Sequence, residues 1–133
     1  MKLEQTMKWK FIFVTLAIVV IIVNLPIINK NILLMIDGND PFRYSNSNAS
    51  FTREESFGFK DSYLTNSSIN RFIEETNPSD EDKQVFRLYK INPLCFWRWS
   101  YYISISRDYK YKSWDEIGLN RVPYDPENMW QDF

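Results

Sequence analysis

Residues 11–23 read FIFVTLAIVVIIV, a run with no charged side chain and only one hydroxyl group, that of Thr15. Apolar character continues to Ile28. The twenty residues from Trp9 to Ile28 would rise about 30 Å as an α-helix, which matches the hydrocarbon thickness of a bilayer. The sequence therefore predicts a transmembrane helix, which we assign to residues 11–28.

A cleaved signal peptide and a buried core helix are the alternatives to a permanent anchor. Signal peptides combine a basic start and an apolar middle with small residues before the cleavage site. Residues 24–30 read NLPIINK and offer no small residue there, and the single cysteine, Cys95, is too distant for a lipoprotein signal. We therefore expect an uncleaved signal anchor.

The flanks of this segment carry residues typical of a membrane interface. Trp9 lies between Lys8 and Lys10, a combination of aromatic and basic side chains found at bilayer surfaces. Pro26 is expected to bend or end the helix near its far side. The predicted anchor residues are Trp9, Phe11, Phe13, Leu16, Ile18, Val23 and Pro26.

Lysine placement predicts the orientation of the anchor. Three lysines precede the apolar run, whereas Lys30 alone follows it closely. The positive-inside rule then puts the N-terminus in the cytoplasm. The predicted order is a cytoplasmic tail (1–10), the transmembrane anchor (11–28), a juxtamembrane segment (29–36) and one extracytoplasmic domain (37–133).

The net charge of −1 conceals an acid–base–acid pattern along that domain. Residues 37–82 hold four basic and ten acidic side chains, residues 83–112 hold seven basic side chains and one acid, and residues 113–133 hold one base and five acids. The simplest interpretation is that these segments neutralise each other within one fold.

Local patterns predict the elements of the domain. Residues 42–44 and 51–53 alternate around the polar run 45–50, which indicates a short β-hairpin. Apolar residues at helical spacing predict a helix over 61–76, stopped by Asn77-Pro78. The tail after 118, with its prolines and Trp130, is expected to be irregular but packed.

Two further helices are predicted from capping signals. Ser79 is followed by three acids and then by Val85, Phe86 and Tyr89 on one helical stripe, which suits a helix ending near Lys90. Ser113-Trp114-Asp115-Glu116 is a capping box that opens a short helix ended by Gly118.

Residues 94–105 fit both a strand and a helix. As a strand, Trp97, Trp99 and Tyr101 would share a face, and as a helix Leu94, Trp97 and Tyr101 would. Asn92-Pro93 favours the helix, because proline suits the first helical turn. The predicted fold class is α+β and mainly helical, with an N-terminal transmembrane helix and one small compact domain containing a short β-hairpin and three to four short helices.

Composition argues against most catalytic chemistry. The chain has no histidine, one cysteine and three glycines, which excludes histidine-based triads, His- or Cys-ligated metal sites, P-loops and dinucleotide motifs. Adjacent acids at 54–55, 74–75 and 80–82 are expected to be solvated rather than catalytic. We predict no enzyme activity, no catalytic residues, no cofactor and no metal.

A basic-aromatic block spans residues 83–114, with seven basic and ten aromatic side chains. Besides forming a core and its rim, such a block suits three partners: single-stranded nucleic acid, a lipid surface or another protein. An extracytoplasmic location argues against nucleic acid. The candidate interaction residues are Phe96, Trp97, Arg98, Trp99, Tyr101, Tyr102 and Arg107.

Together these features predict a single-pass membrane protein with a small extracytoplasmic protein-interaction domain. It would contact the lipid bilayer and a protein partner, as an accessory or structural subunit of a membrane complex or as an immunity-type protein. The alternatives are a membrane-attached enzyme that works through carboxylates, and peripheral lipid-surface binding by the basic-aromatic block.

Overall fold

The computed structural model describes residues 2–36, 42–55 and 62–133, and its architecture is mixed α+β and mostly helical, as predicted. The helices are α1 (Lys2–Val23), α2 (Pro26–Ile36), α3 (Ser62–Thr76), α4 (Trp99–Ser104) and α5 (Trp114–Ile117). The strands are β1 (Phe42–Asn46), β2 (Thr52–Glu55) and β3 (Val85–Arg87). Short 3-10 helices are η1 (Phe96–Arg98), η2 (Ser106–Asp108) and η3 (Gly118–Asn120). Residues 37–41, with which the folded domain was predicted to begin, lie outside the described residues.

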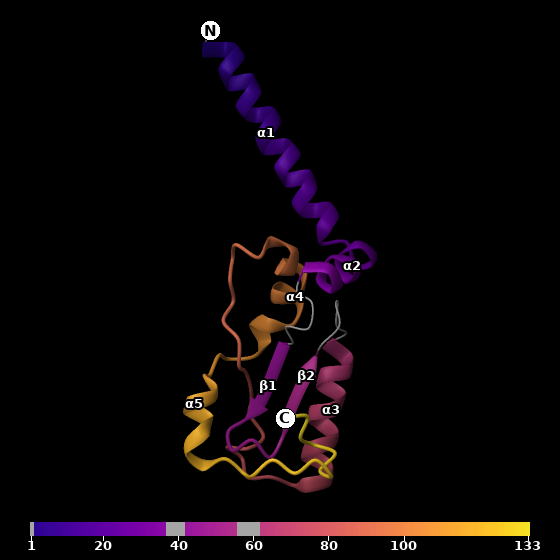
Figure 1. The fold of residues 1–133 in the computed structure, drawn as a ribbon, viewed down its shortest axis with the longest axis vertical. Helices are drawn as coiled ribbons and strands as arrows, with labels where there is room; N and C mark the ends of the chain where they lie inside the picture. The colour runs from indigo at the N-terminus through magenta and orange to yellow at the C-terminus, as the bar shows by residue number, and fades with distance from the viewer. Residues whose placement is uncertain (1, 37–41, 56–61) are drawn as a thin grey trace.

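Helix α1 projects away from the rest of the molecule (Figure 1). Within the described part of the chain it is the one helix long and apolar enough to cross a membrane, over Glu4–Val23, and none of that span is buried. A signal sequence would have the same length and composition. The helix ends at Val23, five residues earlier than predicted.

The early end of α1 has a local cause. Asn24 and Leu25 donate their backbone N–H groups to Ile21 and Ile22, three residues back rather than four, so the last turn tightens. Pro26 then opens α2, because proline needs no N–H partner in a first helical turn. The predicted effect of Pro26 is confirmed, and residues 29–36 are helical.

The sheet has three antiparallel strands in the order β2-β1-β3. Tyr44 pairs with Arg53 across β1 and β2, which confirms the predicted hairpin. Both outer edges are covered by single parallel bridges, Thr52 to Gln131 and Arg87 to Tyr111. Each bridge pairs part of an outer edge and so leaves less unpaired backbone to which another strand could add.

The helix predicted from Ser79 to Lys90 is wrong. Ser79 caps only one turn, in which Asp82 and Lys83 donate to its carbonyl oxygen, and the chain then forms β3. Val85 pairs with Asn46 of β1. Pairing with the open edge of β1 outweighs the local helix signals, since valine and phenylalanine suit a half-buried strand.

Two other predicted helices are confirmed. Helix α3 ends at Thr76, where Asn77 adopts a φ of 44° and Pro78 follows, which is a common way to stop a helix. The capping box of α5 is complete, with the Ser113 hydroxyl accepting from the Glu116 N–H. The C-terminal tail after Asn120 contains no helix or strand.

Residues 96–104 are helical, as η1 followed by α4, so the helical alternative for this segment is confirmed. The start is later than Asn92-Pro93 predicts. The Asn92 side chain instead accepts from the Leu94 N–H at 3.0 Å and closes a turn.

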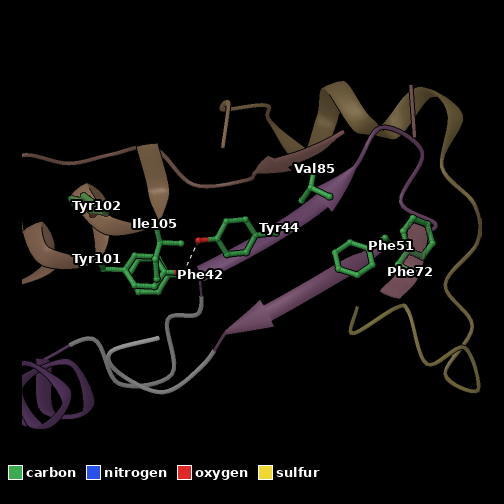
Figure 2. Packing of buried hydrophobic residues seen from close by; sticks show 8 residues of the cluster. All are labelled: Phe42, Tyr44, Phe51, Phe72, Val85, Tyr101, Tyr102 and Ile105. Carbon is green, nitrogen blue, oxygen red and sulfur yellow. Dashed lines mark hydrogen bonds between the residues drawn. The ribbon is translucent and has the colours of Figure 1, made fainter. Parts of the chain in front are cut away.

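The hydrophobic core joins β1, α3 and α4 (Figure 2). Phe42 stacks on Tyr101 with ring centroids 3.9 Å apart, and Phe51 packs against Phe72 at 5.0 Å. Trp130 of the tail packs edge-on to Phe72 at 5.7 Å. The buried members are Phe42, Tyr44, Phe51, Phe72, Val85, Tyr101, Tyr102 and Ile105.

Candidate membrane-proximal site

Asn24 stands in the break between α1 and α2 and connects both helices to the domain. Its side-chain N–H group donates to the carbonyl oxygens of Val20 and Phe96, each at 2.8 Å. Its side-chain oxygen accepts from the backbone N–H of Ser100, also at 2.8 Å. One carboxamide therefore pairs three backbone groups, two of which belong to η1 and α4.

Asn29 makes the second connection, from within α2. Its side chain is fully buried and donates to the carbonyl oxygens of Trp97 and, at 3.0 Å, of Val23. We refer to Asn24 and Asn29 as the asparagine latch. The Asn29 side-chain oxygen is buried without a hydrogen-bond partner, so the two donated bonds offset only part of the cost of burying this amide.

Large apolar side chains remain exposed around the latch. In Figure 1, α2 and α4 lie at the end of the domain from which α1 projects. The exposed side chains come from α2 and from the segment that leads into α4, and we call them the apolar collar: Ile27, Met35, Ile36, Leu94, Phe96 and Trp99.

Polar groups within the collar are already paired. The indole N–H of Trp99 donates to the carbonyl oxygen of Pro93 at 2.9 Å. The Asn31 side chain donates to the carbonyl oxygen of Ile27 at 3.0 Å. Such pairing lowers the cost of moving these side chains into an apolar surrounding.

The two sequence segments that supply the collar carry charge of one sign. Residues 24–36 and 90–107 contain no aspartate or glutamate. They contain four cationic side chains, Lys30, Lys90, Arg98 and Arg107. The apolar collar is therefore bordered by positive charge without any acid in the same segments.

The predicted interaction residues separate into two groups. Tyr101 and Tyr102 are buried in the core. Trp97 and Arg98 are half-buried, and the Arg98 guanidinium lies 4.9 Å from the centre of the Phe42 ring. The exposed members are Phe96, Trp99 and Arg107.

Cations of the basic-aromatic block pack on the domain's own rings. Arg87 lies 5.5 Å from the Tyr111 ring centre and donates to the Tyr109 carbonyl oxygen at 3.1 Å. Lys90 also lies over Tyr111, at 5.7 Å, and Lys112 lies over Phe86 at 5.0 Å. These pairs favour the interpretation of this half of the block as a core and its rim.

A chain of hydroxyl groups crosses the core and ends on a carboxylate. Tyr44 is hydrogen-bonded to Tyr101 at 2.5 Å and to Tyr89 at 2.7 Å. Tyr101 donates to Glu55 at 2.8 Å, and Tyr89 contacts the Ser106 hydroxyl at 2.6 Å. We call these five residues the tyrosine network, and the dashed line in Figure 2 marks its Tyr44–Tyr101 bond.

Burial raises the pKa of all three tyrosines in this network. It also raises the pKa of neighbouring Tyr109 to about 12. These phenols stay protonated at neutral pH, so the network serves packing better than proton transfer.

Glu55 corrects one sequence prediction. Adjacent Glu54 and Glu55 were expected to be solvated, but Glu55 is buried and accepts from Tyr101. Glu54 faces the other side of β2 and pairs with Arg43 at 3.1 Å. Alternation along a strand explains the difference, and no sequence signal indicated which of the two faces inward.

The remaining acids give no metal-binding group in the described part of the chain. Glu75 pairs with Arg71 at 2.6 Å, and Asp80 pairs with Lys83 at 2.7 Å. Two clefts of about 280 and 240 Å³ lie beside the hairpin turn and the tail, and neither is lined by the tyrosine network.

Comparison with known proteins gives no match: no protein-family model, curated protein or solved structure resembles this chain. Functional inference therefore depends on the geometry above. The asparagine latch was missed by sequence reasoning, and its only signal was the occurrence of two asparagines within an otherwise apolar segment.

Proposed function

We propose that this chain is a single-pass membrane protein whose N-terminal helix is a permanent anchor. In this proposal the N-terminus is cytoplasmic, and the folded domain lies outside the cytoplasm as an accessory or immunity-type interaction module. The asparagine latch carries the proposal. Asn24, which directly follows α1, hydrogen-bonds to Val20 of α1 as well as to η1 and α4, so the end of this helix is tied to the folded domain.

Removal of α1 together with Asn24, the residue that directly follows it, would disturb the domain. Cleavage beyond Asn24 would leave the carbonyl oxygen of Phe96 and the N–H of Ser100 without the partner they have now. Loss of a hydrogen bond to such a partly exposed backbone group costs about 0.5–1.5 kcal/mol. The exposed surface of α1 supports the same proposal, because lipid can cover a long apolar helix that the domain leaves bare.

The anchor is tested by the mass and extraction of the protein from its membrane. We expect the full-length mass, and we expect the protein to resist alkaline carbonate, which strips peripheral proteins. A processed chain that lacks α1 would refute the permanent anchor. Alkaline phosphatase fused after Phe133 should be active, whereas a fluorescent protein active only in the cytoplasm should give the weaker signal.

The interaction role is tested by photocrosslinking at Arg107, the exposed predicted residue outside the collar. A photoreactive residue there should give a discrete protein adduct in intact membranes. Leu119, which is also exposed, is the matched control and should give none. Absence of a protein adduct at Phe96, Trp99 and Arg107 alike would exclude the predicted interaction surface.

The enzyme alternative has less support. Glu55, the buried acid among its candidates, lies in the core, where its carboxylate accepts a hydrogen bond from the Tyr101 hydroxyl. Glu54, Glu75 and Asp80 each pair with a neighbouring base. These contacts suit a stable domain, and among the described residues neither of the two clefts is lined by a pair of acids.

A further inference from the structure

We infer that the apolar collar is a lipid-docking surface, which inserts into the bilayer interface beside the anchor and holds the domain against the membrane. This inference depends on the proposed membrane anchor and adds a second contact between the protein and the membrane. The collar side chains would lie at the boundary between lipid headgroups and acyl chains.

Continuity with α1 is the first argument. The collar residues lie on α2 and around η1, and η1 contacts both α2 and the end of α1. The latch bonds from Asn24 and Asn29 to Phe96 and Trp97 fix this arrangement. If α1 crosses a bilayer, the collar is therefore held at the height where the helix leaves the hydrocarbon.

The composition of the collar suits that depth. Trp and Phe are enriched where a membrane meets water, and Leu and Ile add buried apolar area. Leu94 is 82% exposed and Met35 is 86% exposed, so each offers nearly its whole side chain. Trp99 has its N–H paired internally, so insertion leaves no unpaired indole donor.

Charge supports a bilayer over an apolar partner alone. The collar segments carry four cations and no acid, which suits the phosphate groups of phospholipid headgroups. Apolar anchors surrounded by Lys and Arg are typical of helices that lie in the interface plane.

Depth-dependent fluorescence quenching tests the inference on the full-length chain. Cys95 is replaced by alanine, and an environment-sensitive fluorophore is attached after L94C, M35C, V14C or L119C. All four native side chains are exposed, so labelling disturbs little packing. The protein is reconstituted in vesicles of phosphatidylethanolamine and phosphatidylglycerol that contain lipids with a shallow or a deep nitroxide quencher.

We expect the labels at 94 and 35 to emit at shorter wavelength and to be quenched by the shallow nitroxide. The label at 14 should be quenched by the deep nitroxide, and the label at 119 by neither. Leu119 is the matched control for Leu94, because both are exposed leucines of one domain.

Each other result has a defined meaning. If position 14 is quenched but 94 or 35 is not, the anchor holds and the lipid-docking inference is wrong. If 119 is quenched as strongly as 94, docking by one end of the domain is wrong. If position 14 is unquenched, the proposed anchor itself fails. A near-ultraviolet circular dichroism spectrum like that of the Cys95→Ala parent confirms the fold of each labelled protein.

Discussion

The two ends of the domain both expose large apolar side chains, but they differ in what surrounds them. At the end next to α1, Leu94 and Met35 project from segments without acids. At the opposite end, Leu119 and Met129 lie in the segment 113–133, which holds five acids and one arginine. Figure 1 shows α5 and the tail away from α2.

This contrast shows why exposure alone does not identify a binding surface. Single exposed apolar side chains are normal on soluble proteins. A collar whose own segments carry cations and no acid, and which is continuous with a membrane-length helix, has a chemical context that an isolated leucine among acids lacks. Any energetic coupling between the two ends passes through the core that lies between them. Substitutions in that core are therefore the first test.

The largest effect is expected from Tyr101→Ala, which removes the side chain that joins α4 to β1. Tyr101 is fully buried, stacks on Phe42 and donates to Glu55. Loss of a buried aromatic side chain costs about 3–5 kcal/mol. Urea unfolding of the detergent-solubilised full chain measures the loss.

Tyr124→Ala is the matched control for that experiment, because Tyr124 lies exposed in the tail. Its free energy of unfolding should stay within about 0.5 kcal/mol of the parent. Equal destabilisation by the two substitutions would contradict the assignment of Tyr101 to the centre of the fold.

Alkaline pH should weaken the same core. The tyrosine network and Tyr109 favour the protonated phenol in the folded state, whereas an unfolded tyrosine has a pKa of about 10. Their stabilisation is complete below pH of about 10 and decreases above it, by about 1.4 kcal/mol per pH unit for each tyrosine, until the pH passes the folded pKa.

Phenolate absorbance measured together with circular dichroism tests this pH dependence. Four tyrosines should ionise only as the domain unfolds, and Tyr109→Phe should reduce the slope of stability against pH. Ionisation of every tyrosine below pH 12 with the circular dichroism unchanged would contradict the burial of the network.

Sequence reasoning succeeded where the determinants of structure are local. The hairpin at 42–53 and the capping box at Ser113 depend on residues a few positions apart, and both were found. Strand β3 was missed because Val85 pairs with Asn46, which is distant in the sequence. A short stretch of sequence around Val85 does not reveal that the edge of β1 is available for pairing.

In the candidate site, too, features with local determinants were predicted and those that depend on distant residues were not. The apolar character of the anchor was evident from composition, but the asparagine latch became visible only when η1 met α2 in three dimensions. The predicted interaction block was heterogeneous for a similar reason. Tyr101 and Trp99 are two residues apart, yet one turn of α4 buries the first and leaves the second exposed.

Asn29→Ala tests the coupling at the end of the domain next to α1. It removes a buried donor from the carbonyl oxygen of Trp97, so we expect a loss of about 1–3 kcal/mol in unfolding free energy. The segment 91–99 should also become more sensitive to protease. Asn31→Ala is the control, because the exposed Asn31 amide bonds only within α2, and it should change stability by less than about 0.5 kcal/mol. Similar losses in both variants would contradict the role of the latch, because alanine favours a helix more than asparagine does and the Asn31 amide makes no bond to η1.

Ser113→Ala tests the distal end and should have the smallest effect. The Ser113 hydroxyl accepts from the Glu116 N–H at 3.3 Å, and loss of such a cap costs about 1 kcal/mol. Ser104→Ala, in which an exposed hydroxyl bonds only to its own helix, is the control. Because α5 lies away from α2, quenching of a label at position 94 should be the same in Ser113→Ala as in the parent. A shallower label in that variant would show that the distal cap helps to set how deeply the collar sits, and the two ends would then have to be treated as one cooperative unit.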